Sequence, residues 1–437
     1  MKFCMITTFY GANSFGGDAA FVDRLSRALA RRGHEVHVIH CRDAFEIVRG
    51  GQTPRPHQPV PGVVVHELSS PFGALSPLAT QQTGRPFFKR KAIDRIVASV
   101  NPDVVHFHNL SLVGGPGLLK LRAPRAVKLW TTHEHWLVCP SHVLWKNDRE
   151  ICESTACVRC CLKARRPPQF WRSTDLMERS LRHLDAILCP SRSTQREHAK
   201  RGMTSPTVRL PYFLPDDYTG LPERPEPAHD RPYVAAAGRL EKIKGFQDAI
   251  DAMRDLPWLD LRIAGAGQYE HSLREVSMGM NNIHFEGRLD SAEVAALFRG
   301  ARAVAVPSLV YETFGYVVLE AFQERAPVIV RNLGALPELI AESGGGLTFD
   351  SREGLVAGLR RIASDDAFRD ELGEKGHRAR REIWSEERHL ALYFEVIESR
   401  RKLKATSATA PRSGFARRDF DRVGIGAATR LAGFGGS

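Results

Sequence analysis

Short apolar runs alternate with amphipathic stretches along the first part of the chain. Lys2–Thr8 and Glu35–His40 are apolar runs of the kind that predict buried strands. Between them, Phe9–Asp18 is rich in glycine and polar residues and predicts a loop, whereas Ala19–Arg32 carries apolar residues at helical spacing. The pattern predicts a β-α-β unit with a glycine-bearing loop between its first strand and its helix.

The same alternation continues through the next part of the sequence. It predicts a helix at Phe88–Val100 and strands at Val63–Leu68, Asp103–His108, Ala126–Thr132 and Ala186–Pro190. Strands that alternate with helices pair in parallel and are covered by helices on both faces. The pattern breaks at 210–232, where six prolines predict a linker.

A second α/β series follows the linker. Its predicted strands and helices are Tyr233–Ala237, Gly245–Met253, Leu259–Ala264, Ile283–Glu286, Ala292–Arg299, Ala303–Val306, Gly315–Gln323, Val328–Val330 and Glu353–Ser364. We therefore predict an α/β fold with two doubly wound domains that face a central cleft, where the carboxyl ends of the strands bind ligands. The predicted division is 1–210, with a cysteine-rich insertion at 139–161, then 211–402 with a C-terminal helix, then a disordered basic tail at 403–437.

Composition narrows the class of protein without identifying it. Of 437 residues, 43% are hydrophobic and 26% charged, which excludes a wholly disordered chain, a collagen and a coiled coil. Lys and Arg outnumber Asp and Glu by 62 to 50, and the net charge of +12 favours nucleic acid, anionic lipid or phosphate-bearing partners. No run approaches the roughly 18 apolar residues of a membrane span. The apolar run after Lys2 is too short for a secretory signal. We expect a cytoplasmic protein with reduced cysteines.

The strongest chemical signal is the segment Tyr311–Glu320, Y-E-T-F-G-Y-V-V-L-E. Glu312 precedes a predicted helix and Glu320 lies within it, so both carboxylates can reach a ligand. Three residues would lie at the helix N-terminus, where backbone N–H groups and the helix dipole favour an anion; these are Thr313, Phe314 and Gly315. The alternative is an amphipathic helix with two solvated glutamates.

A second segment, Gly238–Gly245, reads G-R-L-E-K-I-K-G directly after an apolar strand. Arg239 and Lys244 flank a turn at the carboxyl end of that strand, where two cations suit a diphosphate. Ordinary surface charge is the alternative. A tight turn at Gly265–Gly267 follows the next strand.

The order of these motifs, G-R-L-…-K-G, I-A-G-A-G, F-E-G-R-L and V-P-S…Y-E-T-F-G-x₄-E, resembles the retaining glycosyltransferases of family 4, which have the GT-B fold. The resemblance runs from Met1 to about Arg401. It implies that Arg239 and Lys244 bind the donor diphosphate and that Glu320 bonds to the ribose hydroxyls. It also implies that the donor sugar is held by Glu312 and by the N–H groups of Phe314 and Gly315. These residues belong to the segment that includes Thr313.

The N-terminal half agrees with this resemblance. Gly16 and Gly17 precede an amphipathic helix that ends R-R-G-H-E-V, and the family's first loop would approach the phosphates and acceptor there. His133, in T-T-H-E-H-W, matches a family histidine near the reacting sugar, and a packed strand-end histidine is the alternative. Asp18 and His108 are further candidates in the same cleft.

The sequence departs from the family pattern in two places. Residues 211–214, P-Y-F-L, replace the common N-G-V-D turn near the linker. Glu134 stands where an aspartate commonly follows the family histidine. Both departures concern the identity of the donor sugar or the acceptor.

The resemblance implies a metal-independent transfer that retains the anomeric configuration, by attack from the leaving-group face. Charge on the departing diphosphate would be stabilised by Arg239, Lys244 and the helix N-terminus. No D-x-D metal motif stands in a matching loop, and no dedicated nucleophile is evident. We therefore expect catalysis without a cofactor, from a nucleotide-sugar donor to a glycan or lipid-linked acceptor, in cell-surface polysaccharide biosynthesis.

Five cysteines crowd into residues 139–161 with the spacing C-x₁₂-C-x₄-C-x₂-C-C. Four thiolates could bind a structural zinc ion, and Cys157 and Cys160 form a C-x-x-C pair of the kind found in zinc sites. The candidate ligands are Cys139, Cys152, Cys157 and Cys160. Free thiols or a local disulfide are the alternatives.

Basic residues are dense in two segments of the N-terminal half. Arg159–Arg209 carries twelve Lys and Arg against four acidic residues, and Arg85–Arg95 places Phe87 and Phe88 beside cations. Aromatic side chains beside cations are typical of peripheral membrane contact, whereas the alternative is a solvated basic face. We expect an anionic membrane surface, at the inner face of the membrane, as a partner.

Two competing functions remain. A zinc-containing nucleic-acid-binding protein would use the cysteines and the basic face, but the two-domain α/β layout argues against it, so we expect no nucleic acid partner. A GT-B-fold sugar-nucleotide epimerase would share the fold, and the E-x₇-E motif with G-R-L-…-K-G favours transfer over that reaction.

Overall fold

The computed structural model describes residues 1–49, 53–54, 57–215 and 231–409. Its first half is built on a seven-stranded sheet in the order β3-β2-β1-β4-β5-β8-β9, with every pair of neighbours parallel. The strands are β1 (Lys2–Ile6), β2 (Glu35–Cys41), β3 (Val63–Leu68), β4 (Val104–Phe107), β5 (Val127–Thr131), β8 (Ala186–Cys189) and β9 (Thr207–Arg209). Strands β4 and β8 are buried at every residue because helices cover both faces of the sheet.

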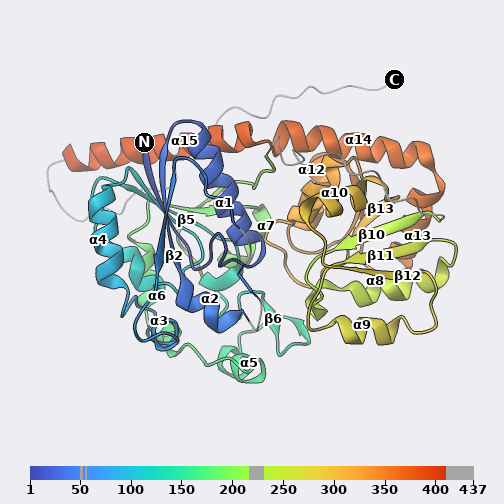
Figure 1. Ribbon diagram of the computed structural model, residues 1–437, viewed down its shortest axis with the longest axis horizontal. Coiled ribbons are helices and arrows are strands. Elements are labelled where there is room, and N and C mark those ends of the chain that lie inside the picture. Colours follow the sequence, from blue (N-terminus) through green and yellow to red (C-terminus); the bar gives the residue numbers. More distant parts are fainter. Residues whose placement is uncertain (50–52, 55–56, 216–230, 410–437) are drawn as a thin grey trace.

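The second half repeats this plan beside the first (Figure 1). Its six-stranded sheet has the order β12-β11-β10-β13-β14-β15. The strands are β10 (Tyr233–Ala237), β11 (Asp260–Ala264), β12 (Ile283–Gly287), β13 (Ala303–Val306), β14 (Val328–Arg331) and β15 (Gly346–Phe349). Two doubly wound, Rossmann-like sheets therefore lie side by side, which confirms the predicted fold class.

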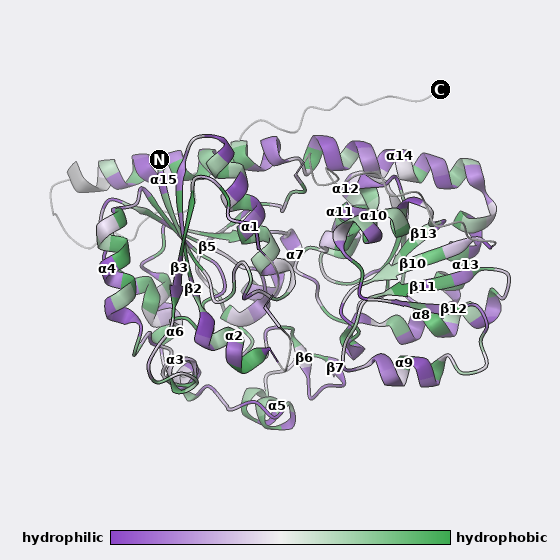
Figure 2. Cartoon of the chain, in the orientation of Figure 1, coloured by the Kyte–Doolittle hydropathy of each residue, from purple (hydrophilic) through white to green (hydrophobic). Residues whose placement is uncertain are grey.

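Helices cover both sheets and turn their polar sides outward (Figure 2). In the first half they are α1 (Gly16–Arg31), α2 (Arg42–Val48), α3 (Leu75–Thr83), α4 (Arg90–Val100), α5 (Cys157–Lys163), α6 (Leu176–Leu181) and α7 (Arg192–Lys200). In the second half they are α8 (Phe246–Ala252), α9 (Glu270–Val276), α10 (Ser291–Arg299), α11 (Tyr316–Gln323), α12 (Leu336–Ser343), α13 (Arg352–Ser364), α14 (Asp366–Ile383) and α15 (Glu386–Thr409). Short 3₁₀ helices include η2 (His135–Leu137), η3 (Phe170–Ser173) and η4 (Lys242–Lys244).

The cysteine-rich insertion adds a small hairpin between the domains. Its two strands, β6 (Trp145–Lys146) and β7 (Glu150–Ile151), pair antiparallel and stand apart from both large sheets. Helix α5 follows this hairpin at the lower edge of Figure 1.

Helix α15 returns from the second domain and crosses the first (Figure 1). The hydroxyl of Tyr393 lies 2.9 Å from Nδ1 of His106 in β4, beneath the ring of Phe3. Near the end of the helix, Arg401 pairs with Asp103 at 3.0 Å and Lys404 with Asp185 at 2.7 Å. The last helix of the chain therefore helps to cover the first sheet.

The boundary residues between the domains are buried rather than exposed. Tyr212, Phe213 and Leu214 belong to one apolar cluster that runs from β1 through α11 to α15. The predicted division at residues 210 and 402 stays a prediction. Helix α15 extends into the predicted tail as far as Thr409, and the rest of that tail lies outside the described residues, as does most of the proline-rich linker.

No helix in the described part of the chain combines the length and the apolar run that crossing a bilayer requires.

Candidate functional site

Glu312 and Lys244 form the centre of the site. Lys244 ends η4, just after β10, and Glu312 lies in the loop between β13 and α11; β10 and β13 are neighbours in the sheet. The Lys244 Nζ lies 2.6 Å from Glu312 Oε1, and Ser308 Oγ donates to the same oxygen at 2.8 Å. The carboxyl ends of two adjacent parallel strands therefore bring together two predicted residues, at the edge where such sheets bind ligands.

The charges at this centre are arranged so that Glu312 stays ionised. Burial by itself would raise the pKa of Glu312, but the charge and hydrogen bond of Lys244, with Ser308 and the charge of Arg239, lower the pKa below its usual value. Side-chain exposure is 19% for Glu312 and 26% for Lys244, so one side of the pair remains open. An anionic ligand could therefore reach the Lys244 ammonium from that side.

Gly245 lets this loop approach the next one. Its φ is +72°, and a Cβ built on it would lie 2.0 Å from the carbonyl oxygen of Pro307. A side chain there would push apart the segments that carry Lys244 and Ser308. Glycine is therefore required at this position by both backbone conformation and space.

Two helix N-termini meet across the domain boundary. Helix α1 begins at Gly16 and helix α11 follows Gly315, and neither has a side chain that caps its first turn. A Cβ at Gly17 would lie 3.5 Å from the ring of Tyr316, the first residue of α11. Uncapped N–H groups of both helices therefore point their positive dipole ends to one region, where a phosphate would be stabilised.

Glu320 takes a different partner from the expected one. Its Oε1 lies 3.3 Å from a guanidinium nitrogen of Arg24 on α1, and the same guanidinium lies 4.4 Å from the ring centroid of Tyr316. The two domains are thus joined by an ion pair at the residue that we expected on the ribose. Contact of Glu320 with ribose stays a prediction.

His133 lies between the domains and is bonded through every polar atom. Its Nδ1 is 2.5 Å from the Tyr212 hydroxyl, its Nε2 is 2.9 Å from His108 Nδ1, and its carbonyl accepts a bond of 2.9 Å from Thr313 Oγ1. Burial lowers the pKa of His133 to about 3, so the imidazole is neutral at ordinary pH. It can therefore serve as a hydrogen-bonding group but not as a cation.

These bonds form a chain that ends at His108. If the Tyr212 hydroxyl donates to His133 Nδ1, then His133 Nε2–H donates to His108 Nδ1 and His108 carries its proton on Nε2. That nitrogen is buried and has no hydrogen-bond partner among the described residues. Nearby Asp18 accepts from the Asn109 amide at 3.1 Å, and burial, then the charge of Glu134, raises its pKa to about 6. Both weaker candidates thus line the same region as His133.

Arg239 extends into solvent. Its side chain is 64% exposed and lies 3.0 Å from Glu241. It is near enough for its charge to act on the pKa of Glu312, but it does not contact that residue. The structure therefore brings Lys244, Glu312, Thr313 and the two helix N-termini together and leaves Arg239 at the rim.

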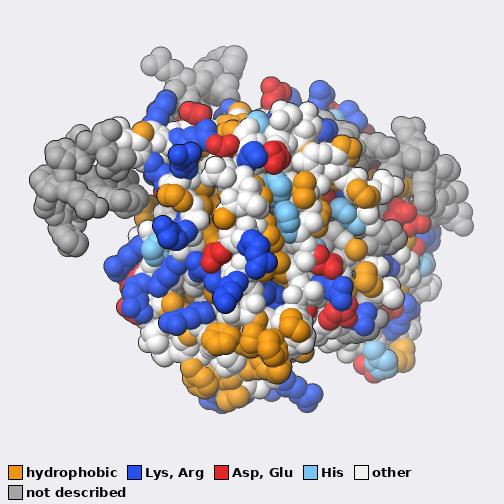
Figure 3. Space-filling view, turned by 60° about the vertical axis from the view of Figure 1, so that its left-hand side comes forward, with side chains coloured by type: hydrophobic (Ala, Val, Ile, Leu, Met, Phe, Trp, Pro, Cys, Tyr) orange, Lys and Arg blue, Asp and Glu red, His pale blue; other side chains and the backbone are white. Residues whose placement is uncertain are grey.

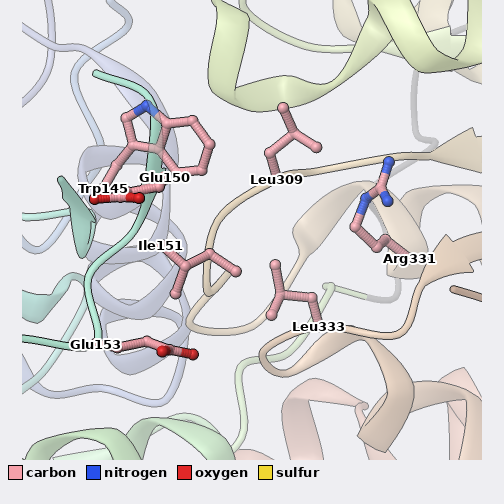
Figure 4. A pocket seen from close by; sticks show the side chains of 7 residues that line it. All are labelled: Trp145, Glu150, Ile151, Glu153, Leu309, Arg331 and Leu333. Atoms are coloured by element: carbon pink, nitrogen blue, oxygen red, sulfur yellow. The ribbon is translucent and has the colours of Figure 1, made fainter. Parts of the chain in front are cut away.

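A hollow of about 410 Å³ lies between the insertion hairpin and the second domain (Figure 4). The hairpin side contributes Trp145, Ile151 and two carboxylates, and the opposite side contributes loops beside Glu312. The lining residues are Trp145, Glu150, Ile151, Glu153, Leu309, Arg331 and Leu333. The insertion therefore shapes the space next to the Lys244–Glu312 pair.

The structure does not assemble the predicted zinc site. Cys139 Sγ lies 3.2 Å from Ser141 Oγ, while the sulfurs of Cys152 and Cys160 each lie 3.7 Å from a backbone carbonyl oxygen. Burial, then the charges of neighbouring cysteines including Cys139, raises the pKa of the Cys157 thiol. Within the described residues, no three His, Cys, Asp or Glu side chains gather as metal ligands, and all eight cysteines are free thiols.

Three residues of the site were not among the predicted site residues: Arg24, Tyr212 and Ser308. Arg24 lies on the polar face of an amphipathic helix, and from the sequence alone this position is expected to face solvent. In the structure it pairs with Glu320 of the second domain. Tyr212 lies in the segment that departs from the family pattern. Ser308 is part of V-P-S, and its place in that motif is a signal that could have found it.

Comparison with known families agrees with this geometry. Residues 15–212 match the family model described as Glycosyltransferase Family 4, and residues 220–379 match the model described as Glycosyl transferases group 1. A glycogen synthase of Mycobacterium tuberculosis is 27% identical over 399 residues, which cover 84% of this chain and 87% of that protein.

Solved structures share the fold. Sucrose-phosphate synthase from Thermosynechococcus elongatus superposes with a TM-score of 0.69 at 19% identity, over 93% of this chain and 99% of the other. HepE of Anabaena, solved in complex with UDP, gives a TM-score of 0.62 at 15% identity, over 91% of this chain and 100% of the other. The two domains therefore have the GT-B arrangement.

Proposed function

We propose an acceptor class and a set of site roles for this chain, which belongs to the retaining glycosyltransferases of family 4 and transfers a sugar from a nucleotide-sugar donor. The acceptor is a glycan or a lipid-linked glycan, and the reaction belongs to the synthesis of cell-surface polysaccharide. The enzyme acts in the cytoplasm, without nucleic acid as a partner. A glycan acceptor is supported by the similarity to a glycogen synthase.

The donor diphosphate lies against Lys244 and the N-terminus of α11, with the N-terminus of α1 opposite. The observation that carries this assignment is the partly open Lys244–Glu312 pair at 2.6 Å, set between two uncapped helix N-termini. Arg239, at the rim, adds an exposed cation that can turn toward the phosphates. Glu312 and the N–H groups of Phe314 and Gly315 hold the donor sugar, and Glu320 bonds to the ribose.

The chemistry follows from these charges. The bond between the anomeric carbon and the β-phosphate oxygen breaks, and the acceptor hydroxyl oxygen forms its bond to the same face of that carbon. The acceptor proton passes to the departing phosphate oxygen. Lys244, Arg239 and the helix dipoles stabilise the charge that develops on the diphosphate, the role that a metal ion has in other enzymes. Members of this family are generally metal-independent.

His133 contributes a neutral hydrogen-bonding group beside the reacting sugar. Because its pKa is about 3, it cannot protonate a leaving group at ordinary pH. Both of its ring nitrogens are bonded to Tyr212 and His108, so its role is to hold this hydrogen-bonded chain in place beside the sugar. The hollow beside the insertion hairpin offers an aromatic side chain and two carboxylates, which suit sugar rings and their hydroxyls, so the acceptor enters there.

The donor is tested by thermal shift against UDP-, GDP- and ADP-sugars. A ligand that binds only the folded chain raises the melting temperature. The sugar nucleotide with the correct nucleotide base should therefore raise the melting temperature, and the other two should not. The shift should shrink in Lys244→Gln and persist in Lys242→Gln, a matched change two residues away. Equal shifts in both variants would refute the diphosphate assignment.

Transfer is tested with the identified donor, a glycan acceptor and nuclear magnetic resonance of the product. We expect the anomeric configuration of the donor to be retained and Glu312→Gln to reduce the transfer rate at least about a hundredfold. Conversion of the donor into an epimer, with no transfer, would instead support the isomerase.

A further inference from the structure

Among the described residues, exposed phenylalanine side chains lie only along one edge of the first domain. The described residues have four exposed phenylalanines: Phe72 at 53%, Phe87 at 67%, Phe88 at 39% and Phe170 at 65%. The rings of Phe72 and Phe88 are 4.6 Å apart between centroids, and those of Phe87 and Phe88 are 5.1 Å apart. Three of the four therefore form one continuous aromatic surface.

Further apolar side chains extend this surface. Helix α3, which follows the turn of Phe72, exposes Leu75 at 59% and Leu78 at 45%. The residue after Phe170 is Trp171, whose Nε1 donates to the carbonyl of Gln81 in the same helix at 2.9 Å, so η3 is fixed beside α3. We call this set the aromatic edge; it comprises Phe72, Leu75, Leu78, Phe87, Phe88 and Phe170.

Cations border the aromatic edge. Arg85, Lys91 and Arg95 are exposed, and none has a carboxylate partner among the described residues. Figure 3 shows hydrophobic side chains gathered at the bottom of this face, with Lys and Arg side chains directly above them. The combination is an apolar patch with an unpaired basic border.

The structure divides the basic stretch that the sequence predicted as one surface. Toward its end, Arg196 pairs with Glu338 at 3.1 Å and Arg209 pairs with Glu342 at 2.6 Å, both on α12 of the second domain. Arg192 also contacts Glu342, at 3.3 Å. These cations join the two domains and are not available to a partner, whereas those bordering the aromatic edge are.

We propose that the aromatic edge and its basic border bind the surface of an anionic lipid bilayer. Phenylalanines at turns insert among the acyl chains near the headgroups, while arginine and lysine above them meet anionic lipid phosphates. The contact is peripheral, because no described helix is suited to cross a bilayer. Charge complementarity favours lipid over an uncharged partner, and it favours an anionic bilayer over a neutral one.

The orientation has a consequence for the enzyme. The insertion helix α5 exposes Val158 at 51% and Leu162 at 62% along the same lower side of the molecule as α3 (Figure 1). A bilayer along this side would therefore border the insertion that shapes the hollow beside Glu312. A lipid-linked acceptor would reach the hollow from the membrane without leaving it.

Sedimentation of the full chain with vesicles, without donor or acceptor, tests the proposal. The probes are phosphatidylcholine vesicles with and without phosphatidylglycerol, at low and high salt. We expect binding to the anionic vesicles alone and loss of binding at high salt. Binding that is equal for the two vesicles, or absent for both, overturns the proposal, and the second result leaves an acidic protein surface as the partner.

Variants locate the surface. Phe87→Ala with Phe88→Ala should weaken binding by at least about tenfold for each side chain that inserts. Arg85→Gln, Lys91→Gln and Arg95→Gln together should weaken it by about a hundredfold, at about fivefold for each cation.

The matched controls lie on the other domain. Trp258→Ala with Met278→Ala removes exposed apolar groups there, and a triple change of Arg378, Arg381 and Arg388 to Gln removes the same amount of charge. These controls should bind as the unchanged chain does, and circular dichroism should be the same for all. Equal weakening in the controls and the test variants overturns the location. Because vesicle binding is measured without transfer, the result is independent of the proposed reaction.

Discussion

Replacing Lys244 with methionine would leave the Glu312 carboxylate without its cation. In the unchanged protein the two groups lie 2.6 Å apart, and Ser308 donates the only other hydrogen bond that this oxygen accepts within the described part of the chain, at 2.8 Å. Methionine keeps most of the side-chain volume and removes the charge, so the perturbation is electrostatic. We expect the second domain to become less stable because a partly buried charge loses its partner.

The size of the effect follows from the exposure of the pair. Breaking a fully buried pair costs about 3–5 kcal/mol, and a hydrogen bond between charged groups contributes about 1.5–3 kcal/mol. With Glu312 19% exposed and Lys244 26% exposed, water recovers part of the loss. We therefore expect about 2 kcal/mol, which lowers the melting temperature of a domain of this size by about 4–8 °C.

The effect has a defined dependence on pH. The pKa of Glu312 is lowered in the folded chain, so its pair stabilises the fold above the unfolded pKa of about 4.3, and this contribution is lost as pH falls through the folded pKa. In the variant, burial without Lys244 should raise that pKa instead. The difference in stability between the two proteins should then narrow as pH falls from about 7 toward about 5.

Thermal unfolding followed by circular dichroism measures both results. Lys242→Met is the matched control, since it makes the same change in the same turn and loses only an exposed bond of 3.3 Å to the carbonyl of Asp148. Adding Glu312→Gln to Lys244→Met should restore much of the stability by removing the unpaired charge. The reasoning is refuted if Lys244→Met is no less stable than Lys242→Met, or if their difference does not change with pH.

Three further predictions follow from other parts of the structure. Tyr212→Phe leaves the buried Nδ1 of His133 without its bond of 2.5 Å, so thermal unfolding should show a loss of about 1–3 kcal/mol and kcat should fall about tenfold, and near-normal kcat would show that Tyr212 does not orient the histidine. Gly245→Ala should cost about 4 kcal/mol in thermal unfolding because its Cβ would meet the Pro307 oxygen at 2.0 Å, whereas Gly279→Ala, with the same sign of φ and open space, should cost about 1–2 kcal/mol. The melting temperature should also fall as pH drops below about 6.5, because buried histidines with lowered pKa values bind protons only in the unfolded chain. Each such histidine should lower the free energy of unfolding by up to about 1.4 kcal/mol per pH unit. A melting temperature that stays constant down to about pH 5 would contradict this. The histidines concerned are His106, His108, His133 and His389.

The hydrophobic pattern predicted much of the fold because strands that are buried on both faces of a parallel sheet appear in the sequence as unbroken apolar runs. The predicted strand Val63–Leu68 coincides with β3, and the predicted helix Gly315–Gln323 begins one residue before α11. Strand β15, of only four residues, begins with glycine and was missed. Its place at the sheet edge depends on pairing with β14, which a local pattern does not contain.

The site was predicted in part for a related reason. Glu312 and Lys244 lie at the carboxyl ends of strands within one domain, so local sequence motifs were enough to predict both residues. Arg24 and Tyr212 matter only once two domains meet, and nothing in their own segments indicates a partner far along the chain. The cysteines were the opposite case: their thiols lie close enough to raise one another's pKa values, but no three of them gather as metal ligands among the described residues.

Helix α15 follows the second domain in the sequence but packs against the sheet of the first domain. A fragment that ended at the linker would leave His106 without the Tyr393 hydroxyl at 2.9 Å and Asp103 without Arg401 at 3.0 Å. Recombination that exchanged the second domain between related enzymes would bring a foreign final helix against the first sheet of the recipient. The residues of α15 that face this sheet are therefore constrained by partners in the first domain, although they are encoded with the second.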